Sequence, residues 1–130
     1  MGQRYLVDTS AVIKYLNDDF PSEGTLFMDN EIADEQMISF ISEIELQSWT
    51  PANADDMEVY LDFIKDATIL SIDASIIKQT IEIRKNQKLK IPDAIIAATA
   101  IVNDFTLITD NDKDFNRVLL LKYINPNTLK

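Results

Sequence analysis

The chain of 130 residues contains no cysteine and no histidine. Without cysteine there are no disulfides and no thiolate metal ligands, and a reducing compartment is the natural environment. Without histidine there is no histidine general base, no Ser-His-Asp or Cys-His arrangement and no histidine zinc site. The side chains that remain for catalysis are mainly carboxylates, whose oxygens suit hard cations such as Mg²⁺ or Mn²⁺.

Glycine is also scarce, because Gly2 and Gly24 are the only two, and this excludes a glycine-rich phosphate-binding loop. No run approaches 18 apolar residues, so we expect no transmembrane span and no membrane association. The first four residues lead directly into an apolar run and leave no room for a signal peptide. We therefore expect a cytoplasmic protein.

The composition is that of an ordinary globular protein, with 46% hydrophobic and 26% charged residues, and we expect a single domain over residues 1–130. The net charge of −10 favours solubility and argues against general coating of nucleic acids, because attraction to phosphate needs Lys and Arg. An enzyme of this charge that acts on nucleic acid would need a local basic patch and metal ions to offset its own field.

Short apolar runs alternate with stretches of helical periodicity. We predict strands at residues 5–7, 37–40, 68–72 and 105–109, with a possible edge strand at 122–124. We predict helices at residues 11–16, 22–29, 44–49, 54–65, 74–86 and 92–102. Thr9 and Ser10 are candidate N-caps of the first helix. This alternation predicts an α/β fold with a mainly parallel sheet.

Four acidic residues are expected to meet at one edge of that sheet. Asp8 and Asp110 come directly after two predicted strands, and Glu45 and Asp93 lie in the first turns of predicted helices. Crowded carboxylates repel one another without a cation, so their convergence implies a metal site. A divalent ion held in this way lowers the pKa of a bound water and stabilises the leaving oxygen of a phosphodiester.

Each of these carboxylates also has a purely structural interpretation. Asp8 can be a charged turn residue. Ser42 and Glu45 fit the capping box S-x-x-E, in which the glutamate folds back onto the helix start. Asp93 follows Pro92 in a first helical turn, where the helix dipole favours negative charge.

The acidic run after residue 109 has the appearance of a calcium loop. An EF-hand that begins at Asp110 needs Gly at its sixth position and Glu at its twelfth, and this chain has Phe115 and Leu121 there. We reject that interpretation.

A cluster of basic residues is formed by Arg84, Lys85, Lys88 and Lys90. It is either a solvated helix end or a surface that steers phosphate.

The chain carries four motifs in order: LVDTS at 6–10, ISFISEIEL at 38–46, IPDAIIAA at 91–98 and LITDNDKDF at 107–115. Together they resemble PIN domains, and more narrowly the VapC-type toxins of bacterial toxin–antitoxin pairs, over nearly the whole chain. The resemblance implies a PIN-like three-layer α/β/α fold with a mainly parallel central sheet of four to five strands. It also implies a Mg²⁺- or Mn²⁺-dependent endoribonuclease that forms a homodimer and is blocked by a cognate antitoxin. Its substrate would be RNA, with transfer RNA or another structured RNA as candidates.

The resemblance assigns roles to individual residues. Asp8, Glu45 and Asp93 match the acidic metal ligands of the family. Glu43 is also near, but the family's glutamate directly precedes Leu, which favours Glu45. Thr9 and Thr109 match hydroxyl positions near the metal or the scissile phosphate, and we include them as supporting residues.

The chain departs from the family at the fourth acidic position. The family often has Asp two residues after the Thr, where this chain has Asn111. An asparagine still accepts through its carbonyl oxygen but brings no charge. Asp112 and Asp114 are candidates to compensate, and Asp114 is included as a metal ligand because an Asp before Phe recurs in the family. The number of metals therefore stays open.

Two other functions remain. The first is a catalytically silent PIN-like module that binds a protein or RNA partner, with Asn111 marking decay of the site. The second is a metal-dependent phosphatase or a nuclease that acts on DNA. The backbone phosphates of RNA and DNA are the same group for a carboxylate-held metal site. Contacts to the 2′-hydroxyl are therefore the expected basis for selecting RNA.

Overall fold

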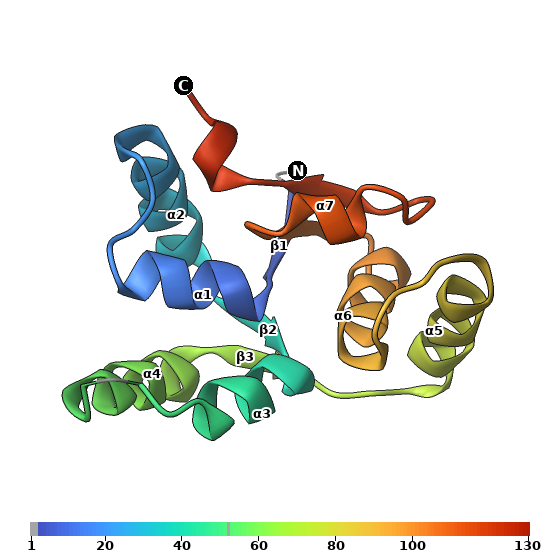
Figure 1. The fold of residues 1–130 in the computed structure, drawn as a ribbon, viewed down its shortest axis with the longest axis horizontal. Helices are drawn as coiled ribbons and strands as arrows, with labels where there is room; N and C mark the ends of the chain where they lie inside the picture. The colour runs from blue at the N-terminus through green and yellow to red at the C-terminus, as the bar shows by residue number, and fades with distance from the viewer. Residues whose placement is uncertain (1–2, 52) are drawn as a thin grey trace.

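The computed structural model describes residues 3–51 and 53–130 (Figure 1). The strands in this part of the chain are β1 (Tyr5–Val7), β2 (Met37–Ser39), β3 (Thr68–Leu70), β4 (Thr106–Ile108) and β5 (Lys122–Ile124). Its helices are α1 (Thr9–Leu16), α2 (Ser22–Asp34), α3 (Phe40–Ser48), α4 (Asp55–Asp66), α5 (Ala74–Asn86), α6 (Ile91–Val102), α7 (Asp112–Phe115) and the 3-10 helix η1 (Pro126–Thr128). None of the helices among these residues combines the length and the apolar character needed to cross a membrane.

All of these strands run parallel to their neighbours, in two sheets. One sheet has the order β1-β4-β5 and the other is the pair β2-β3. In the larger sheet Leu6 pairs with Leu107 and Val7 with Ile108. The two sheets meet where β1 packs against β2. The predicted α/β fold of parallel strands flanked by helices is confirmed, with its strands divided between two hydrogen-bonded sheets.

The strands lie between two apolar clusters. Successive side chains of a strand point to opposite faces, so Leu6 and Leu107 join one cluster and Val7 and Ile108 join the other. The first cluster is completed by α5 and α6, and the second by α1, α2, α3 and α4. Figure 1 shows these two groups of helices on opposite sides of β1. This arrangement is the layered α/β/α architecture.

The helix starts near the sheet edge differ from the predictions. The N-cap of α1 is Asp8, one residue before the predicted Thr9 or Ser10, because α1 begins as soon as β1 has ended. The N-cap of α3 is Ser39, whose side chain accepts from the backbone N–H of Ile41 at 3.1 Å. Ser42 is therefore a buried residue inside α3, and the alternative interpretation of Glu45 as the partner of Ser42 in a capping box does not hold.

Other elements were predicted with small differences in length. Asp73 is the N-cap of α5, and it accepts from the N–H of Ile76 at 2.8 Å. Helix α2 extends five residues beyond the predicted end at residue 29. The short elements α7 and η1 were not predicted, since three or four residues carry too little periodicity to identify a helix.

The only described glycine, Gly24, holds α2 against η1. A Cβ atom at this position would lie 2.3 Å from the carbonyl oxygen of Pro126 and 2.9 Å from its carbonyl carbon. Both contacts are with backbone, which cannot turn away as a flexible side chain can. The close approach of the chain end to α2 therefore requires glycine here.

We predict that Gly24→Ala destabilises the protein although alanine has the higher helix propensity. The clash with Pro126 should lower the free energy of unfolding by about 1–3 kcal/mol, as overpacking typically does. Urea denaturation measures this, with Asn30→Ala on the exposed face of α2 as the control. A Gly24→Ala protein as stable as the control would contradict the packing described here.

Candidate functional site

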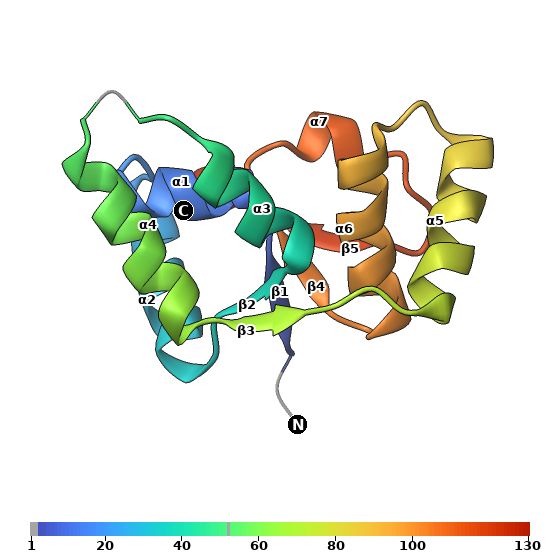
Figure 2. The ribbon, with the colours of Figure 1, turned by 90° about the horizontal axis from the view of Figure 1, so that it is seen from below.

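The candidate site is built where β1 and β4 end. The backbone N–H of Asp8 donates to the carbonyl of Ile108 at 2.8 Å, which continues the parallel pairing by one residue. The carbonyl of Asp8 then accepts from the N–H groups of Ala11 and Val12, both at 3.0 Å, in the first turn of α1. The backbone of Asp8 is thus fixed by the sheet on one side and by the helix on the other. Figure 2 shows α1, α3, α6 and α7 on this side of the strands.

The carboxylate of Asp8 is held through one of its two oxygens. Its Oδ2 accepts hydrogen bonds from Thr109 Oγ1 and from Ser10 Oγ, each at 2.8 Å. No described residue donates to Oδ1, yet every fully buried side-chain polar atom of the described residues has a partner. Oδ1 must therefore reach the solvent, although the residue as a whole is only 5% exposed. One oxygen of a buried carboxylate is left open to a ligand.

The surroundings of Asp8 favour its protonated form. Burial is the main cause, and the nearby charges of Asp93 and Glu45 add to it. The hydrogen bonds from Thr109 and Ser10 act in the opposite direction. The net result raises the pKa of Asp8 to about 6, from an ordinary value of 3.8. A carboxylate whose pKa is raised by burial and by acidic neighbours, as that of Asp8 is, is typical of a functional site.

Glu45 reaches the site from α3. Its Oε1 accepts a hydrogen bond from Thr9 Oγ1 at 2.6 Å, and Thr9 Oγ1 also lies 2.8 Å from Ser42 Oγ. Because a hydroxyl has one proton, Thr9 donates to the carboxylate and accepts from Ser42. This chain of contacts fixes Glu45 against the start of α1, where its charge acts on Asp8.

Asp93 comes from a third direction, the first turn of α6. Burial raises the pKa of Asp93, and the charges of Glu45 and Asp114 raise it further, while Lys90 partly offsets them. Asp8, Glu45 and Asp93 therefore lie within electrostatic reach of one another, although they are far apart in the sequence. Helix α6 can bring its carboxylate here because most of the residues that follow Asp93 in it are buried and fix the helix in the core.

Asn111 and Asp114, two of the candidates for the fourth acidic position, bind each other. The side-chain amide of Asn111 donates to Asp114 Oδ2 at 2.8 Å, and its backbone N–H donates to Thr109 Oγ1 at 3.0 Å. Thr109 thus connects Asn111 to Asp8. The charge of Asp114 acts on Asp93.

Asp110, predicted at the same edge, has a different partner. Its Oδ2 lies 3.7 Å from Lys14 Nζ, and its charge is not among those that raise the pKa of Asp8 or Asp93. The lysine of α1 thus offsets the charge of Asp110. Sequence reasoning missed this ion pair, and it also missed Ser10 and Ser42 as hydrogen-bonding partners within the site.

The donors of the site are carboxylate, hydroxyl and amide oxygens, which fit a hard cation such as Mg²⁺ or Mn²⁺. Among residues 3–51 and 53–130, no three or more acidic side chains are already grouped as a complete set of metal ligands. The carboxylates of Asp8 and Glu45 instead turn an oxygen toward Thr109 and Thr9. The chemistry of the donors fits the ion, although the carboxylates that the structure describes are not already gathered as a ligand set.

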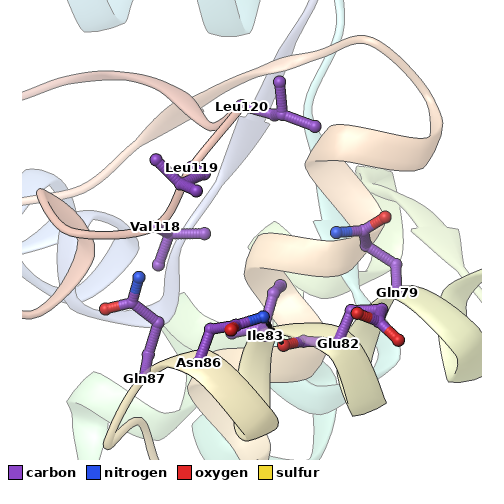
Figure 3. Close-up of a pocket in the computed structure, with 8 residues that line it drawn as sticks. All are labelled: Gln79, Glu82, Ile83, Asn86, Gln87, Val118, Leu119 and Leu120. Carbon is purple, nitrogen blue, oxygen red and sulfur yellow. Dashed lines mark hydrogen bonds between the residues drawn. The ribbon is translucent and has the colours of Figure 1, made fainter.

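A separate pocket of about 300 Å³ lies between α5 and the segment that follows α7 (Figure 3). Its lining includes Ile83, Val118, Leu119 and Leu120 together with several polar side chains of α5, and Glu82 is its one acid among the described residues. Leu119 and Leu120 are 77% and 81% exposed. With a single acid and no partner for it, this pocket offers no set of residues for catalysis.

Comparison with known proteins agrees with this geometry. Residues 5–119 match the family model of the PIN domain. The fold is similar to VapBC2 from Rickettsia felis bound to a promoter DNA fragment, with 25% identity and a TM-score of 0.78 over 95% of this chain and 98% of that chain. It is also similar to a toxin–antitoxin complex from Klebsiella pneumoniae, with 26% identity and a TM-score of 0.70 over 94% and 97% of the two chains.

A third similar structure is DNA-bound VapBC from Salmonella typhimurium, with 20% identity and a TM-score of 0.80 over 96% of this chain and 99% of that chain. At this identity the likeness concerns the fold alone. No curated protein sequence matches the chain.

We predict that Asp8→Asn stabilises the metal-free protein at neutral pH. The folded state binds the Asp8 proton more tightly than the unfolded chain does, so the contribution of Asp8 to stability falls as the pH rises from about 4 to about 6. At pH 7.5 in EDTA, Asp8→Asn should therefore raise the free energy of unfolding by roughly 1–3 kcal/mol. Near pH 4 the difference should almost vanish.

Urea denaturation at the two pH values measures both quantities. Asp62→Asn, at an exposed position of α4, is the matched control and should change little at either pH. An Asp8→Asn protein that is less stable than wild type at pH 7.5 would show that Asp8 stabilises the fold in its charged form.

Proposed function

The chain belongs to the PIN domain family, and from this premise we propose that it is a metal-dependent endoribonuclease and the toxin of a toxin–antitoxin pair. PIN domains are typically nucleases. The observation that carries the proposal is the meeting of Asp8, Glu45 and Asp93 beside the open Oδ1 of Asp8. Three acids from three different elements, in a chain with no histidine or cysteine, suit metal-assisted hydrolysis of a phosphodiester.

We assign the metal ligands as Asp8, Glu45 and Asp93, with Asp114 as a further ligand. A Mg²⁺ or Mn²⁺ ion bound by them would supply a water of lowered pKa and neutralise the charge of the scissile phosphate. In this proposal Asn111 acts in catalysis by fixing Asp114 and by presenting an amide to the substrate.

The other residues hold these ligands in place. Thr109 and Ser10 bind Asp8 Oδ2 and so direct Oδ1 outward. Thr9 restrains Glu45 through Oε1. Ligand carboxylates must lose their protons when an ion binds, so the raised pKa of Asp8, about 6, would weaken metal binding as the pH falls below that value.

We propose RNA as the substrate because the four motifs resemble VapC-type toxins, and 2′-hydroxyl contacts would provide the choice over DNA. The similar structures from Rickettsia felis and Klebsiella pneumoniae contain antitoxins, and we propose a cognate antitoxin and a homodimer for this chain as well. With its net charge of −10, the surface outside the site can attract a basic antitoxin segment.

A catalytically silent binding module is the alternative. It would explain Asn111 as decay of an acidic position. The amide of Asn111 is nevertheless engaged with Asp114 at 2.8 Å, and Thr109 bonds both Asn111 and Asp8. A position that still connects two proposed ligands argues for a working site.

We predict that the purified, antitoxin-free protein cleaves total cellular RNA into discrete fragments with Mg²⁺ or Mn²⁺, and leaves it intact in EDTA. Asp93→Asn removes a proposed ligand charge and should reduce the cleavage rate by about 100-fold or more. The rate is read from gels or from a fluorogenic RNA. Asp62→Asn is the control, since its side chain is exposed on α4 and should leave the rate unchanged.

Wild-type cleavage by Asp93→Asn would remove this residue from the proposed site. A folded wild-type protein that leaves RNA intact under every condition, and shows no saturable Mn²⁺ binding dependent on Asp8, would favour the silent module.

We predict that Thr9→Val weakens Mn²⁺ binding, because it removes the hydroxyl that restrains Glu45 while nearly keeping the side-chain volume. Loss of such a supporting partner typically weakens metal affinity by about 10- to 100-fold. Calorimetric titration with Mn²⁺ measures this effect. Thr80→Val is the matched control, since the Thr80 hydroxyl donates to the Ile76 carbonyl within α5. Equal affinities of Thr9→Val and wild type would contradict a role for Thr9.

A further inference from the structure

A polar cavity of about 220 Å³ lies beside the candidate metal centre. It is formed by the connection from α5 to α6 on one side and by α7 with the residues after it on the other. Its lining residues are Gln87, Lys88, Leu89, Lys113, Asp114 and Arg117. Half of them are cations. We call it the basic cavity.

The three cations of the basic cavity are exposed, and none of them forms an ion pair with a residue that the structure describes. The ion pairs of that part of the chain use other basic residues, Arg4, Lys14 and Lys122. The protein has 22 acidic and 12 basic residues, so most of its surface repels anions. The three cations of this cavity outnumber Asp114, its single acid among the described residues, so the charge of its lining is opposite in sign to that of the whole protein.

Hydrogen bonds from side chains to backbone carbonyls connect the segments that form the basic cavity. The side chain of Gln87 donates to the carbonyl of Arg117, which connects the end of α5 to the segment after α7. The guanidinium of Arg84 donates to the carbonyl of Leu89 at 2.6 Å. The Arg84 side chain thus stabilises the loop between α5 and α6, while Lys88 lines the cavity. The basic residues around the cavity are therefore held on a fixed frame.

Asp114 joins the basic cavity to the candidate metal centre. It lines the cavity, it accepts from Asn111 at 2.8 Å, and its charge acts on Asp93. A nucleic acid strand carries one phosphate per about 3.4 Å of axis in a duplex. A strand with one phosphate at the metal centre therefore brings its next phosphates to the adjacent cavity.

We propose that the basic cavity binds a backbone phosphate of the substrate strand, close to the phosphate that is cleaved. This inference rests on the proposed nuclease function. A cavity of about 220 Å³ far exceeds the 10–15 Å³ that one water needs, so it has room for a hydrated phosphate group. Lys113 and Arg117, from α7 and the residues after it, line the cavity together with Lys88 and supply the charge. The basic cavity thus provides the local cluster of cations that an acidic protein needs in order to bind a polyanion.

The test is the double substitution Lys113→Gln and Arg117→Gln, which removes two positive charges from the basic cavity. The Gln87 contact survives, because it uses the carbonyl of Arg117 and not its side chain. The matched control is Lys65→Gln with Lys78→Gln, which removes two exposed charges from the last turn of α4 and the start of α5. Unfolding midpoints of both double variants should equal that of wild type.

Binding is measured by fluorescence anisotropy with a labelled 12-nucleotide single-stranded RNA and with DNA of the same sequence. EDTA is present, so that the metal centre contributes nothing, and the salt concentration runs from 50 to 200 mM. Removing one cation that binds a phosphate should make the slope of log affinity against log salt shallower by about 0.7. We expect the cavity variant to bind about 5- to 10-fold more weakly at 50 mM salt, equally for RNA and DNA, because phosphate contacts carry no sequence information. The control variant should stay within about twofold of wild type.

Cleavage kinetics with Mg²⁺ give a second measurement. The cavity variant should raise KM and leave kcat nearly unchanged, since it acts on substrate binding. Equal RNA affinity and equal KM for the cavity variant and wild type would overturn the phosphate site, while metal-dependent cleavage by both would leave the proposed nuclease function intact. A wild-type protein that binds no RNA would also overturn it. Loss of affinity for the antitoxin alone, with RNA binding unchanged, would assign the basic cavity to a protein partner.

Discussion

The hydrogen bond from Thr109 to Asp8 is the contact on which the rest of the site depends. Asp8 ends β1 and Thr109 follows β4, so this one bond of 2.8 Å joins two neighbouring strands at the point where the sheet stops. It compensates part of the cost of burying a carboxylate, and it does so through a single oxygen. The other oxygen stays open to a ligand. A buried charge that is only half satisfied destabilises the fold by itself, and a bound cation would remove that cost.

A hydrogen bond from a neutral side chain to one carboxylate oxygen is also found at two other proposed ligands. A hydroxyl of Thr9 binds one oxygen of Glu45, and an amide of Asn111 binds one oxygen of Asp114. Metal sites commonly orient their ligands through outer hydrogen bonds. This chain has no histidine, and short neutral side chains from neighbouring elements perform that task. Each donor occupies one carboxylate oxygen, so the second remains available.

Local signals in the sequence were enough to predict the fold and to identify candidate site residues. Asp8 and Asp93 were chosen as candidates because each stands at the boundary of a strongly apolar element, and boundaries of that kind are visible in a linear pattern. The role of Ser42 was misjudged because α3 begins at Phe40, where Ser39 provides the cap, and a capping box two residues later has the same local appearance. The pairing of Asp110 with Lys14 was not foreseen because it depends on how α1 packs over the sheet edge. Contacts between residues far apart in the chain have no local signature.

The basic cavity also depends on residues far apart in the chain, which local sequence patterns do not reveal. It bears on how the net charge of −10 is interpreted. The sequence shows a cluster from Arg84 to Lys90, yet within it Arg84 orders a loop through Leu89, and Lys113 and Arg117 come from a different part of the chain. A net charge of −10 argues against binding a polyanion only if the charges are spread evenly. Here unpaired cations gather beside the carboxylates that would hold a metal, so the field over the site differs from the field of the whole molecule.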